Sequence, residues 1–529
     1  MFKRALVSTS DKTGLLEFLK PFCAQGCEIV STGGTSKFLR ENGVKVVEVG
    51  EATGFPEVMD GRVRTLHPKI HMGLLARSYV PDDMALLQAH GVEPFDLLVV
   101  NLYPFEAAFK KGLKGEELIE QIDIGGPSML RAAAKSFERV TVVCDPGDYS
   151  LISKKVDEKT LDKKFRQKLA VKVFEHCSFY DGIVAHALRE DPWEEAETIT
   201  VPLRRKQLLR YGENPHQKAV WYESPFQHDL GLSAASILQG KELSYNNILD
   251  LEAAVGVVAD FEEPACAIIK HLSPCGVATD KSVEGAYQKA FEADSISAFG
   301  GIVAINRALT ASLAEAIVGP FLECVIAPEI DSGALKILSA KKNLRVLALK
   351  NFGLNRSARI YGHNGTHQDT RPPESQWGDD LEVKSLRGGA LIQAADRPSS
   401  WQSQWRIIGQ SPDDTVKADL LFAQKVVRHI KSNGISVVKN GQTLGLCGGQ
   451  TNRIDSVRWA LERAKGRGTE LVLGSDAFFP FRDSIDMAAA SGVRWIIQPG
   501  GSLRDAEVEK AAREHGLNMI ITGTRHFKH

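Results

Sequence analysis

Short apolar runs alternate with helical patterns along the first 150 residues of the chain. The runs at residues 5–7, 28–31, 44–49, 96–102 and 140–143 are strand-like, and the segments between them repeat apolar residues at helical spacing. Such alternation predicts an α/β fold with a parallel sheet covered by helices. Ligands of such folds bind outside the carboxyl ends of the strands, so the turns there are the first candidate site.

Size and composition are those of an ordinary globular protein. The 529 residues suffice for two or more domains, with 43% hydrophobic and 25% charged residues. Lys and Arg number 65 against 66 Asp and Glu, and this balance gives no reason to expect nucleic acid or an anionic membrane as a partner. We find no apolar signal region, no run near the roughly 20 apolar residues of a membrane span and no Cys-x-x-Cys pair, and we expect a reduced, cytoplasmic protein.

An acidic segment at residues 191–197 marks a domain boundary, which we place near residue 200. This predicts an N-terminal domain of residues 1–200 and a C-terminal domain of residues 201–529. Further apolar runs in the second domain predict another α/β region; they lie at residues 265–269, 301–305, 435–438 and 495–497. The polar segment 363–380 is expected to be an exposed loop, and no repeat of solenoid period is visible.

The segment 122–135 combines an acid with a glycine-rich helix start. Its two adjacent glycines allow a ligand to approach the backbone, and Pro127 suits the first position of a helix. The free N–H groups of such a helix start attract anions, above all phosphate. With Asp123 and a titratable Lys135 beside it, such a site can do chemistry as well as bind. A plain helix start with solvated charges is the alternative.

Polar turns follow three of the predicted strands and are expected to share one rim of the sheet. They are Ser8–Lys12 after the first strand, Thr32–Thr35 after the second and Asn101–Pro104 after the fourth. Arg62 and Arg64 add two cations that can make forked bonds to phosphate. A surface loop with solvated arginines is the alternative, but the shared rim favours a phosphate site.

In the second half, Lys270 and His271 stand together at the end of an apolar strand. Each cation disfavours protonation of the other, and we expect partial burial to act in the same direction. A neutral His271 can accept a proton while Lys270 stabilises developing negative charge. Charges that simply point into water are the alternative.

Three further turns are dense in polar groups, at Arg210–Gln217, Leu446–Arg453 and Ser475–Asp483. Each is either a ligand site or a structural turn, and the aromatic residues of the last one suit a flat ligand. The motifs of nucleoside-triphosphate loops, zincins and hydrolase elbows are missing, and we expect no catalytic metal.

Taken together, these segments resemble the bifunctional purine-biosynthesis family that combines AICAR transformylase with IMP cyclohydrolase. The resemblance runs nearly end to end, and the order of the motifs makes it specific. The motifs are Ser10–Gly14, Gly61–Pro68, Asn101–Phe105, Ile122–Lys135, Arg210–Gln217, Lys270–His271, Ser475–Asp483 and Arg525.

The resemblance implies an N-terminal methylglyoxal-synthase-like domain with a doubly wound parallel sheet. It also implies a larger C-terminal α/β transformylase region built of cytidine-deaminase-like subdomains. The C-terminal region would transfer a formyl group from the co-substrate 10-formyltetrahydrofolate to AICAR, giving FAICAR and tetrahydrofolate. The N-terminal domain would then close FAICAR to IMP with loss of water. The family further implies a homodimer with transformylase sites between the subunits, and neither nucleic acid nor a membrane as partner.

For ring closure, the resemblance makes Lys135 the proton-transfer lysine, and Asp123 and Tyr103 can share the proton movements. The matching IMP-binding positions are Ser10, Asp11, Lys12, Thr32, Gly33, Gly34, Thr35, Arg62, Val63, Arg64, Thr65, Asn101, Leu102 and Ile124. An alternative assigns this domain to phosphate sensing, in which it binds a phosphorylated effector without turnover. Lys135 argues against that alternative, because a sensor does not need it.

For formyl transfer, the resemblance makes His271 the base, Lys270 the transition-state stabiliser and Asn433 a further site residue. The matching ribotide-binding positions are Arg210, Tyr211, Gly300, Arg453, Phe478 and Arg525, while Asp483 and Ser502 are expected on the folate side. Glu323 stands where family members often carry Asp, and we expect the longer acid to reach the same ligand hydroxyl.

Overall fold

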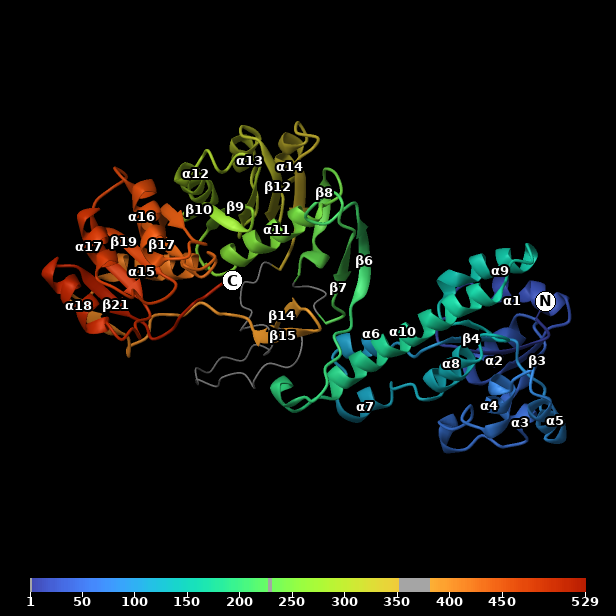
Figure 1. Ribbon diagram of the computed structural model, residues 1–529. Coiled ribbons are helices and arrows are strands. Elements are labelled where there is room, and N and C mark those ends of the chain that lie inside the picture. The colour runs from blue at the N-terminus through green and yellow to red at the C-terminus, as the bar shows by residue number, and fades with distance from the viewer. Residues whose placement is uncertain (1, 227–230, 352–380) are drawn as a thin grey trace. The chain divides into compact units, whose positions relative to one another are not determined.

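The computed structural model describes residues 2–226, 231–351 and 381–529 (Figure 1). The predicted loop at residues 363–380 lies outside the described residues. The chain divides into two compact units, of which the first ends at Leu203 and the second begins at Arg204. No helix in the described ranges is long and apolar enough to cross a membrane.

The N-terminal unit contains the predicted parallel sheet. Its strands are β1 (Arg4–Thr9), β2 (Glu28–Ser31), β3 (Val46–Glu48), β4 (Leu97–Asn101) and β5 (Thr141–Val143). They pair in parallel in the order β3-β2-β1-β4-β5. The third strand is shorter than predicted because the helix α3 begins at Val49. The strand order reverses direction at β1, so a switch point lies between β1 and β4, where α/β sheets bind their ligands.

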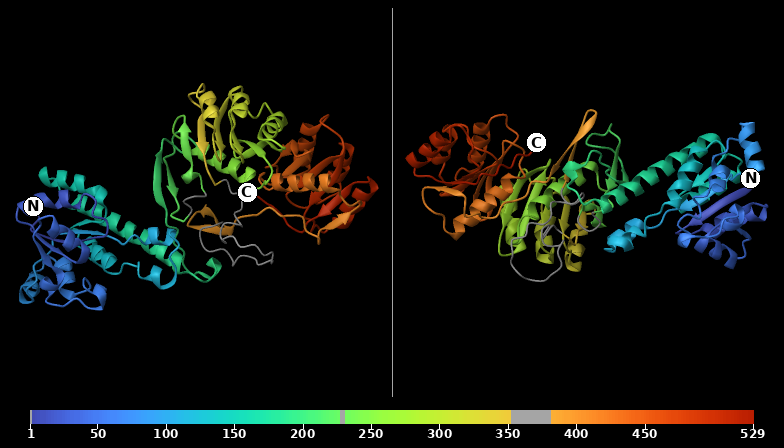
Figure 2. Two further views of the ribbon diagram at one scale, coloured as in Figure 1. Left: turned by 180° about the vertical axis from the view of Figure 1, so that it is seen from behind. Right: turned by 90° about the horizontal axis from the view of Figure 1, so that it is seen from below.

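Helices separate the strands of this unit. They are α1 (Leu15–Ala24), α2 (Gly33–Glu41), α3 (Val49–Thr53), α4 (Pro68–Leu75), α5 (Pro81–Ala89), α6 (Phe105–Lys110), α7 (Gly115–Ile119), α8 (Gly125–Lys135), α9 (Tyr149–Asp157) and α10 (Lys163–Leu188). The helix α10 runs unbroken in both views of Figure 2 and packs on α8 and β5. It starts where the Asp162 side chain accepts a hydrogen bond from the Phe165 N–H at 2.7 Å, and Leu169, Val173 and Cys177 form its buried stripe.

The second unit is built on one twelve-stranded sheet in the order β16-β21-β20-β19-β17-β18-β10-β9-β11-β12-β13-β8. These strands are β8 (Ser236–Gln239), β9 (Ala265–Lys270), β10 (Ser273–Thr279), β11 (Gly301–Ile305), β12 (Leu322–Ala327), β13 (Arg345–Ala348), β16 (Arg406–Ile408), β17 (Ile435–Lys439), β18 (Gln442–Cys447), β19 (Leu471–Ser475), β20 (Val493–Gln498) and β21 (Asn518–Ile521). Two separate hairpins are formed by β6 (Arg204–Leu209) with β7 (Ala219–Glu223), and by β14 (Leu381–Leu386) with β15 (Gly389–Ala394).

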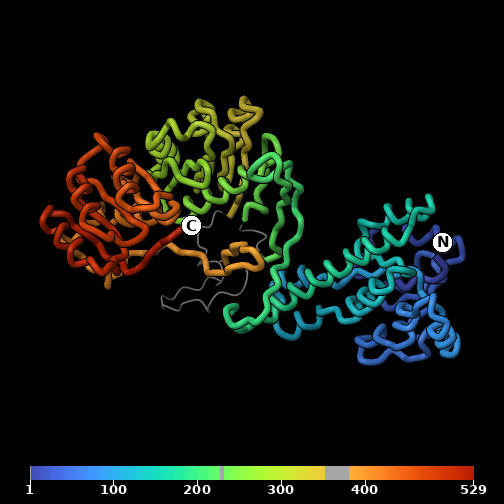
Figure 3. Tube along the Cα trace, in the orientation of Figure 1, coloured from blue at the N-terminus to red at the C-terminus, as the bar shows by residue number. Residues whose placement is uncertain are grey.

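The α-helices described in the second unit fall into two groups of four. The first group is α11 (Tyr245–Val258), α12 (Val283–Ala293), α13 (Ala311–Val318) and α14 (Ser332–Leu338). The second group is α15 (Asp414–Val427), α16 (Arg453–Ala464), α17 (Asp483–Ala490) and α18 (Asp505–Glu514). In Figure 3 the first group lies in the green to yellow part of the unit and the second in the orange to red part.

The second unit consists of two halves, which are copies of one module. From the centre outward, β10-β9-β11-β12-β13-β8 mirrors β18-β17-β19-β20-β21-β16, and the halves join where β10 pairs with β18. Gly276 and Gly445 hold matching places, because a Cβ on either one would collide with a helix carbonyl, that of Ala290 or Ala460. The two glycines are 169 residues apart, far beyond a solenoid period. That the modules are cytidine-deaminase-like stays a prediction.

Candidate functional site

Three of the predicted polar turns meet at the switch point of the N-terminal sheet. Asn101, at the end of β4, accepts hydrogen bonds from the N–H groups of Ser10 at 2.6 Å and Asp11 at 2.9 Å. Its amide nitrogen donates to the Asp11 carbonyl at 2.7 Å. The N–H of Thr9 donates to the Thr35 hydroxyl at 2.9 Å, which ties the turn after β2 to β1. Residues that are far apart in the sequence thus form one rim of the sheet.

The Arg64 side chain lies across this rim, in space that is free because Gly33 and Gly61 have no side chain. Its guanidinium donates to the Thr32 hydroxyl at 3.2 Å and to the Gly61 carbonyl at 3.0 Å. A Cβ on Gly33 would stand 2.6 Å from an Arg64 nitrogen, and one on Gly61 would collide with the same guanidinium. Arg62 instead forms an ion pair with Glu120 on the surface. The structure therefore separates the two arginines that the sequence grouped together.

Asp123 is held at the start of α8. Its carboxylate accepts from the N–H of Gly126 at 2.7 Å and from that of Tyr103 at 3.4 Å, and its own N–H donates to the Tyr180 hydroxyl at 2.8 Å. Burial raises the pKa of the Asp123 carboxyl above its usual range, although the two N–H donors act in the opposite direction. A partly buried acid therefore faces the rim beside the exposed Tyr103 ring. Tyr180, on α10, gave no signal in the sequence.

Two details predicted for α8 are wrong. The helix begins at Gly125, so Pro127 is its third residue rather than its first. Lys135 is its last residue, ten positions on, which puts it roughly 15 Å along the axis from Gly125 at 1.5 Å per residue. The exposed Lys135 side chain therefore does not stand beside the helix start. Together with Phe137 and Phe174 it lines a cavity of about 630 Å³.

Gly126→Ala is expected to lower the cyclisation that the family resemblance implies by about tenfold, because the Asp123 carboxylate must move. The added Cβ would lie 2.5 Å from the Asp123 Oδ2 and 2.7 Å from the Leu102 Cδ2, and such overpacking costs about 1–3 kcal/mol of stability. Steady-state turnover of FAICAR and a thermal melt measure the two effects. Gly389→Ala is the control, since its Cβ would meet nothing within 4 Å. Unchanged cyclisation would show that the Asp123 geometry is not critical.

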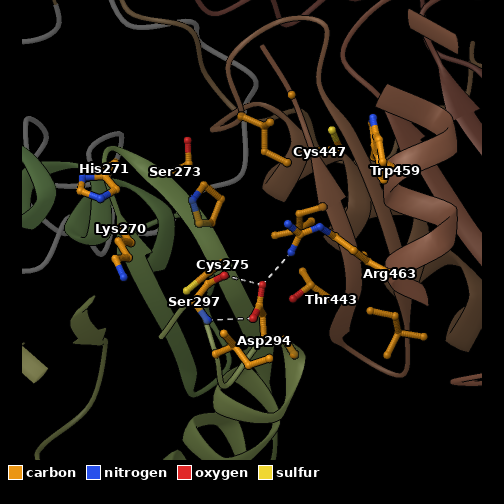
Figure 4. A pocket seen from close by; sticks show the side chains of 18 of the residues that line it. Lys270, His271, Ser273, Cys275, Asp294, Ser297, Thr443, Cys447, Trp459 and Arg463 are labelled. Carbon is orange, nitrogen blue, oxygen red and sulfur yellow. Dashed lines mark hydrogen bonds and ion pairs between the residues drawn. The ribbon is translucent and has the colours of Figure 1, made fainter. Parts of the chain in front are cut away.

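A cavity of about 840 Å³ lies between the two modules of the second unit (Figure 4). Lys270 and His271 line it from the first module, and Lys431, Trp459 and Arg463 line it from the second. The Lys270 ammonium donates to the Phe299 carbonyl at 2.7 Å, next to Gly300. His271 is exposed, so the expectation of a partly buried histidine is wrong. It lies in the turn between β9 and β10.

Asn433 and Arg453 are brought together beside this cavity. The Arg453 guanidinium donates to the Asn433 Oδ1 at 2.7 Å and to the Ser475 hydroxyl at 2.9 Å, and it pairs with Asp476. The Asn433 amide nitrogen donates to the carbonyl of Gln450, which lines the cavity. Arg453 is only 6% exposed. Arg453 therefore fixes the Asn433 side chain, and its contact with a ribotide stays a prediction.

The other predicted positions of the first module are not among the residues that line this cavity. Arg210 stacks on Tyr211, with the guanidinium carbon 4.7 Å from the ring centroid, in the exposed turn after β6. Glu323, on β12, pairs with Arg345 at 3.0 Å and accepts from the Asn247 amide at 3.4 Å. None of the three predicted residues lines the cavity formed by the described residues.

The same holds for the predicted positions of the second module. Phe478 precedes α17, Asp483 begins it, and the Ser502 hydroxyl accepts from the Arg504 N–H at 3.1 Å. The Arg525 guanidinium lies 4.4 Å from the centroid of the Phe527 ring. Within the described chain, these residues do not line the cavity that Lys270 and His271 border.

Sequence reasoning missed the ion pair that bridges the modules at this cavity. The carboxylate of Asp294 accepts from the guanidinium of Arg463 at 2.7 Å and from the Ser297 hydroxyl at 2.7 Å (Figure 4). Asp294 and Arg463 are 169 residues apart, so no local pattern links them. In the described part of the chain, no three His, Cys, Asp or Glu side chains are grouped as metal ligands.

Two family models match this chain. Residues 133–463 match the model described as AICARFT/IMPCHase bienzyme, and residues 14–128 match the MGS-like domain. The chain belongs to the AICARFT/IMPCHase bienzyme family. It is similar to the bifunctional purine biosynthesis protein PurH of Persephonella marina, at 46% identity over 100% of both chains. The PurH proteins of Aquifex aeolicus (99% of this chain, 100% of the relative) and Bacillus subtilis (100% and 99%) are also 46% identical.

Family membership confirms several predictions. The fold is α/β, with an MGS-like N-terminal domain and a larger C-terminal region. The protein is a bifunctional enzyme of purine biosynthesis, an AICAR formyltransferase and IMP cyclohydrolase. Its formyl transfer uses 10-formyltetrahydrofolate as co-substrate.

Proposed function

We propose that the two compact units divide the two reactions. The unit that ends at Leu203 closes FAICAR to IMP, and the unit that begins at Arg204 forms FAICAR. The observation that carries this division is the presence of two separate polar constellations, each with a proton-transfer group. Asp123 stands at the switch point of one sheet, and Lys270 with His271 borders the cavity of the other.

For ring closure, the amide nitrogen of FAICAR attacks the formyl carbon of the same molecule. A C–N bond forms, the nitrogen loses a proton, the formyl oxygen becomes a hydroxyl, and water then leaves. Because both reacting atoms belong to one molecule, holding them in register supplies much of the acceleration. Asp123 and Tyr103 move the protons in this proposal. The rim residues Ser10–Lys12, Thr32–Thr35, Arg62–Thr65, Asn101, Leu102 and Ile124 bind the ribotide.

Lys135 enters the proposal through the family resemblance alone. We expect Lys135→Ala to slow cyclisation less than Asp123→Asn does, because Lys135 lies at the far end of α8. Initial rates with supplied FAICAR measure the order of the two effects, and formyl transfer by the same preparations controls for folding. If Lys135→Ala has the larger effect, the proton route of this proposal must pass through the lysine.

For formyl transfer, the amine of AICAR is a poor nucleophile because its lone pair is delocalised into the imidazole. His271 takes a proton from this amine as its nitrogen attacks the formyl carbon of 10-formyltetrahydrofolate. Lys270 stabilises the negative charge that develops on the formyl oxygen. The bond from that carbon to N10 then breaks, N10 takes the proton from His271, and tetrahydrofolate leaves. Asn433, fixed by Arg453, orients the substrate.

We also propose a homodimer in the cytoplasm. Phe478 and Arg525 of the second module do not line the cavity with His271, and this supports a site that a second copy completes. Light scattering of the purified full chain during gel filtration tests this state. A monomer with full formyl transfer would overturn it.

A combined assay tests the function as a whole. Purified protein with AICAR and 10-formyltetrahydrofolate should yield IMP. Absence of both FAICAR and IMP would reject the proposal. Binding of FAICAR to the N-terminal unit without turnover would instead favour the phosphate-sensing alternative.

A further inference from the structure

The two modules of the second unit carry matching hairpin turns. In the first module, Lys270 pairs with Ser273 across the two-residue turn His271-Leu272. In the second, Lys439 pairs with Gln442 across Asn440-Gly441. All four turn residues have positive φ, 53° and 63° in the first turn and 51° and 66° in the second. Both are therefore type I′ turns, which require this backbone at both positions.

The two turns differ in how well their residues suit this backbone. Asn-Gly is the favoured pair for a type I′ turn, because glycine has no Cβ and asparagine tolerates the left-handed region. Leu272 has no such tolerance, because it is a bulky residue in a conformation that such residues avoid. Strained residues of this kind persist only where their surroundings hold them, and they cluster at functional sites. The two turns can be compared directly, because they belong to two copies of one module in the same chain.

An aspartate on the preceding helix holds each turn. Asp250, the sixth residue of α11, accepts from the N–H of Leu272 at 2.7 Å. Asp419, the sixth residue of α15, accepts from the N–H groups of Asn440 and Gly441, both at 2.7 Å. Equivalent hydrogen bonds to an aspartate therefore hold a relaxed turn in one module and a strained turn in the other.

Only the strained turn faces the cavity. Lys270 and His271 line it on the left of Figure 4, whereas Lys439 and Asn440 are not among its lining residues. The second turn contacts the first module instead. The Lys289 ammonium donates to the Asn440 carbonyl at 3.3 Å, and a Cβ on Gly441 would lie 2.6 Å from the Thr279 hydroxyl.

We propose that Asp250 is a positioning residue for formyl transfer. Its carboxylate holds the His271-Leu272 turn in the strained conformation that presents the imidazole to the cavity. The inference rests on the proposed role of His271 as the base. Asp419 makes the equivalent contact at a turn without that role, and it supplies a matched control within the same chain.

The test compares Asp250→Ala with Asp419→Ala in the full-length protein. We expect Asp250→Ala to lower kcat for formyl transfer on the order of 10²-fold, the effect of a small displacement of a catalytic group, with KM for AICAR within about threefold. Asp419→Ala should lower the melting temperature at least as much and leave kcat within about twofold. Asp250→Asn, which keeps an acceptor oxygen, should recover most of the lost kcat. Equal kcat in the two alanine variants would overturn the inference.

A second variant decides the matter if Asp250→Ala does not fold. Leu272→Gly relieves the strain because glycine suits a type I′ turn, so Asp250→Ala combined with Leu272→Gly should fold and still show a lower kcat than Leu272→Gly alone. Equal kcat in that pair would overturn the inference. Loss of formyl transfer in His271→Ala, with full activity in Asp250→Ala, would reject the positioning role alone. Retained transfer in His271→Ala would reject the proposed base itself.

Discussion

Formyl transfer is expected to fall on the order of 10²–10⁴-fold in His271→Ala, the usual contribution of a positioned base. The AICAR amine has little nucleophilicity until a base takes its proton, and His271 is the histidine that lines the cavity. Cyclisation of supplied FAICAR should be unchanged, because the N-terminal unit has its own core and its own rim residues. Separate initial-rate assays of the two reactions measure this contrast.

Asn440→Ala is the matched control for that variant. Asn440 occupies the equivalent turn position in the second module, also with positive φ, so alanine there imposes a similar backbone strain. We expect formyl transfer to survive in this control. If both variants lose formyl transfer equally, strain in the sheet rather than lost proton transfer would explain the defect. If both reactions fail in His271→Ala, the division of labour between the units would be wrong.

Asp123→Asn should produce the converse defect, with cyclisation lowered on the order of 10²–10⁴-fold and formyl transfer retained. The amide keeps the shape of the carboxylate and can still accept from the Gly126 N–H, but it cannot take up a proton. Turnover of FAICAR, with binding of IMP measured separately by calorimetry, distinguishes lost chemistry from lost affinity. Cyclisation at the parent rate would remove Asp123 from the mechanism.

The pH dependence provides an independent check on this aspartate. Since burial raises its pKa, Asp123 keeps its proton to higher pH than an exposed aspartate does. If its carboxylate acts as the base, the acid limb of the cyclisation profile lies above the ordinary aspartate range. A raised pKa favours the folded state below that pKa and disfavours it above, so the charged form opposes folding at neutral pH. Asp123→Asn should therefore not lower the melting temperature at pH 7.

The sequence alone determined the local elements of this protein. Apolar periodicity located the five strands of the N-terminal sheet, because strand and helix periods differ within a few residues. It also placed Lys270 at the end of a strand and the polar turns after β1, β2 and β4. The third strand was predicted too long because Val49 continues an apolar run but begins a helix. Family motifs in sequence order then predicted both activities.

Tertiary structure decided which of these local features meet. The duplicated module escaped detection because its halves match in strand order and turn geometry over 169 residues, not in short motifs. The burial of Arg453 and the exposure of His271 depend on neighbours distant in sequence. The rise of α8, about 1.5 Å per residue, separates Lys135 from an acid that looks close in sequence. Residues close together in the sequence determine local conformation, whereas contacts between distant segments form only when the sheets assemble.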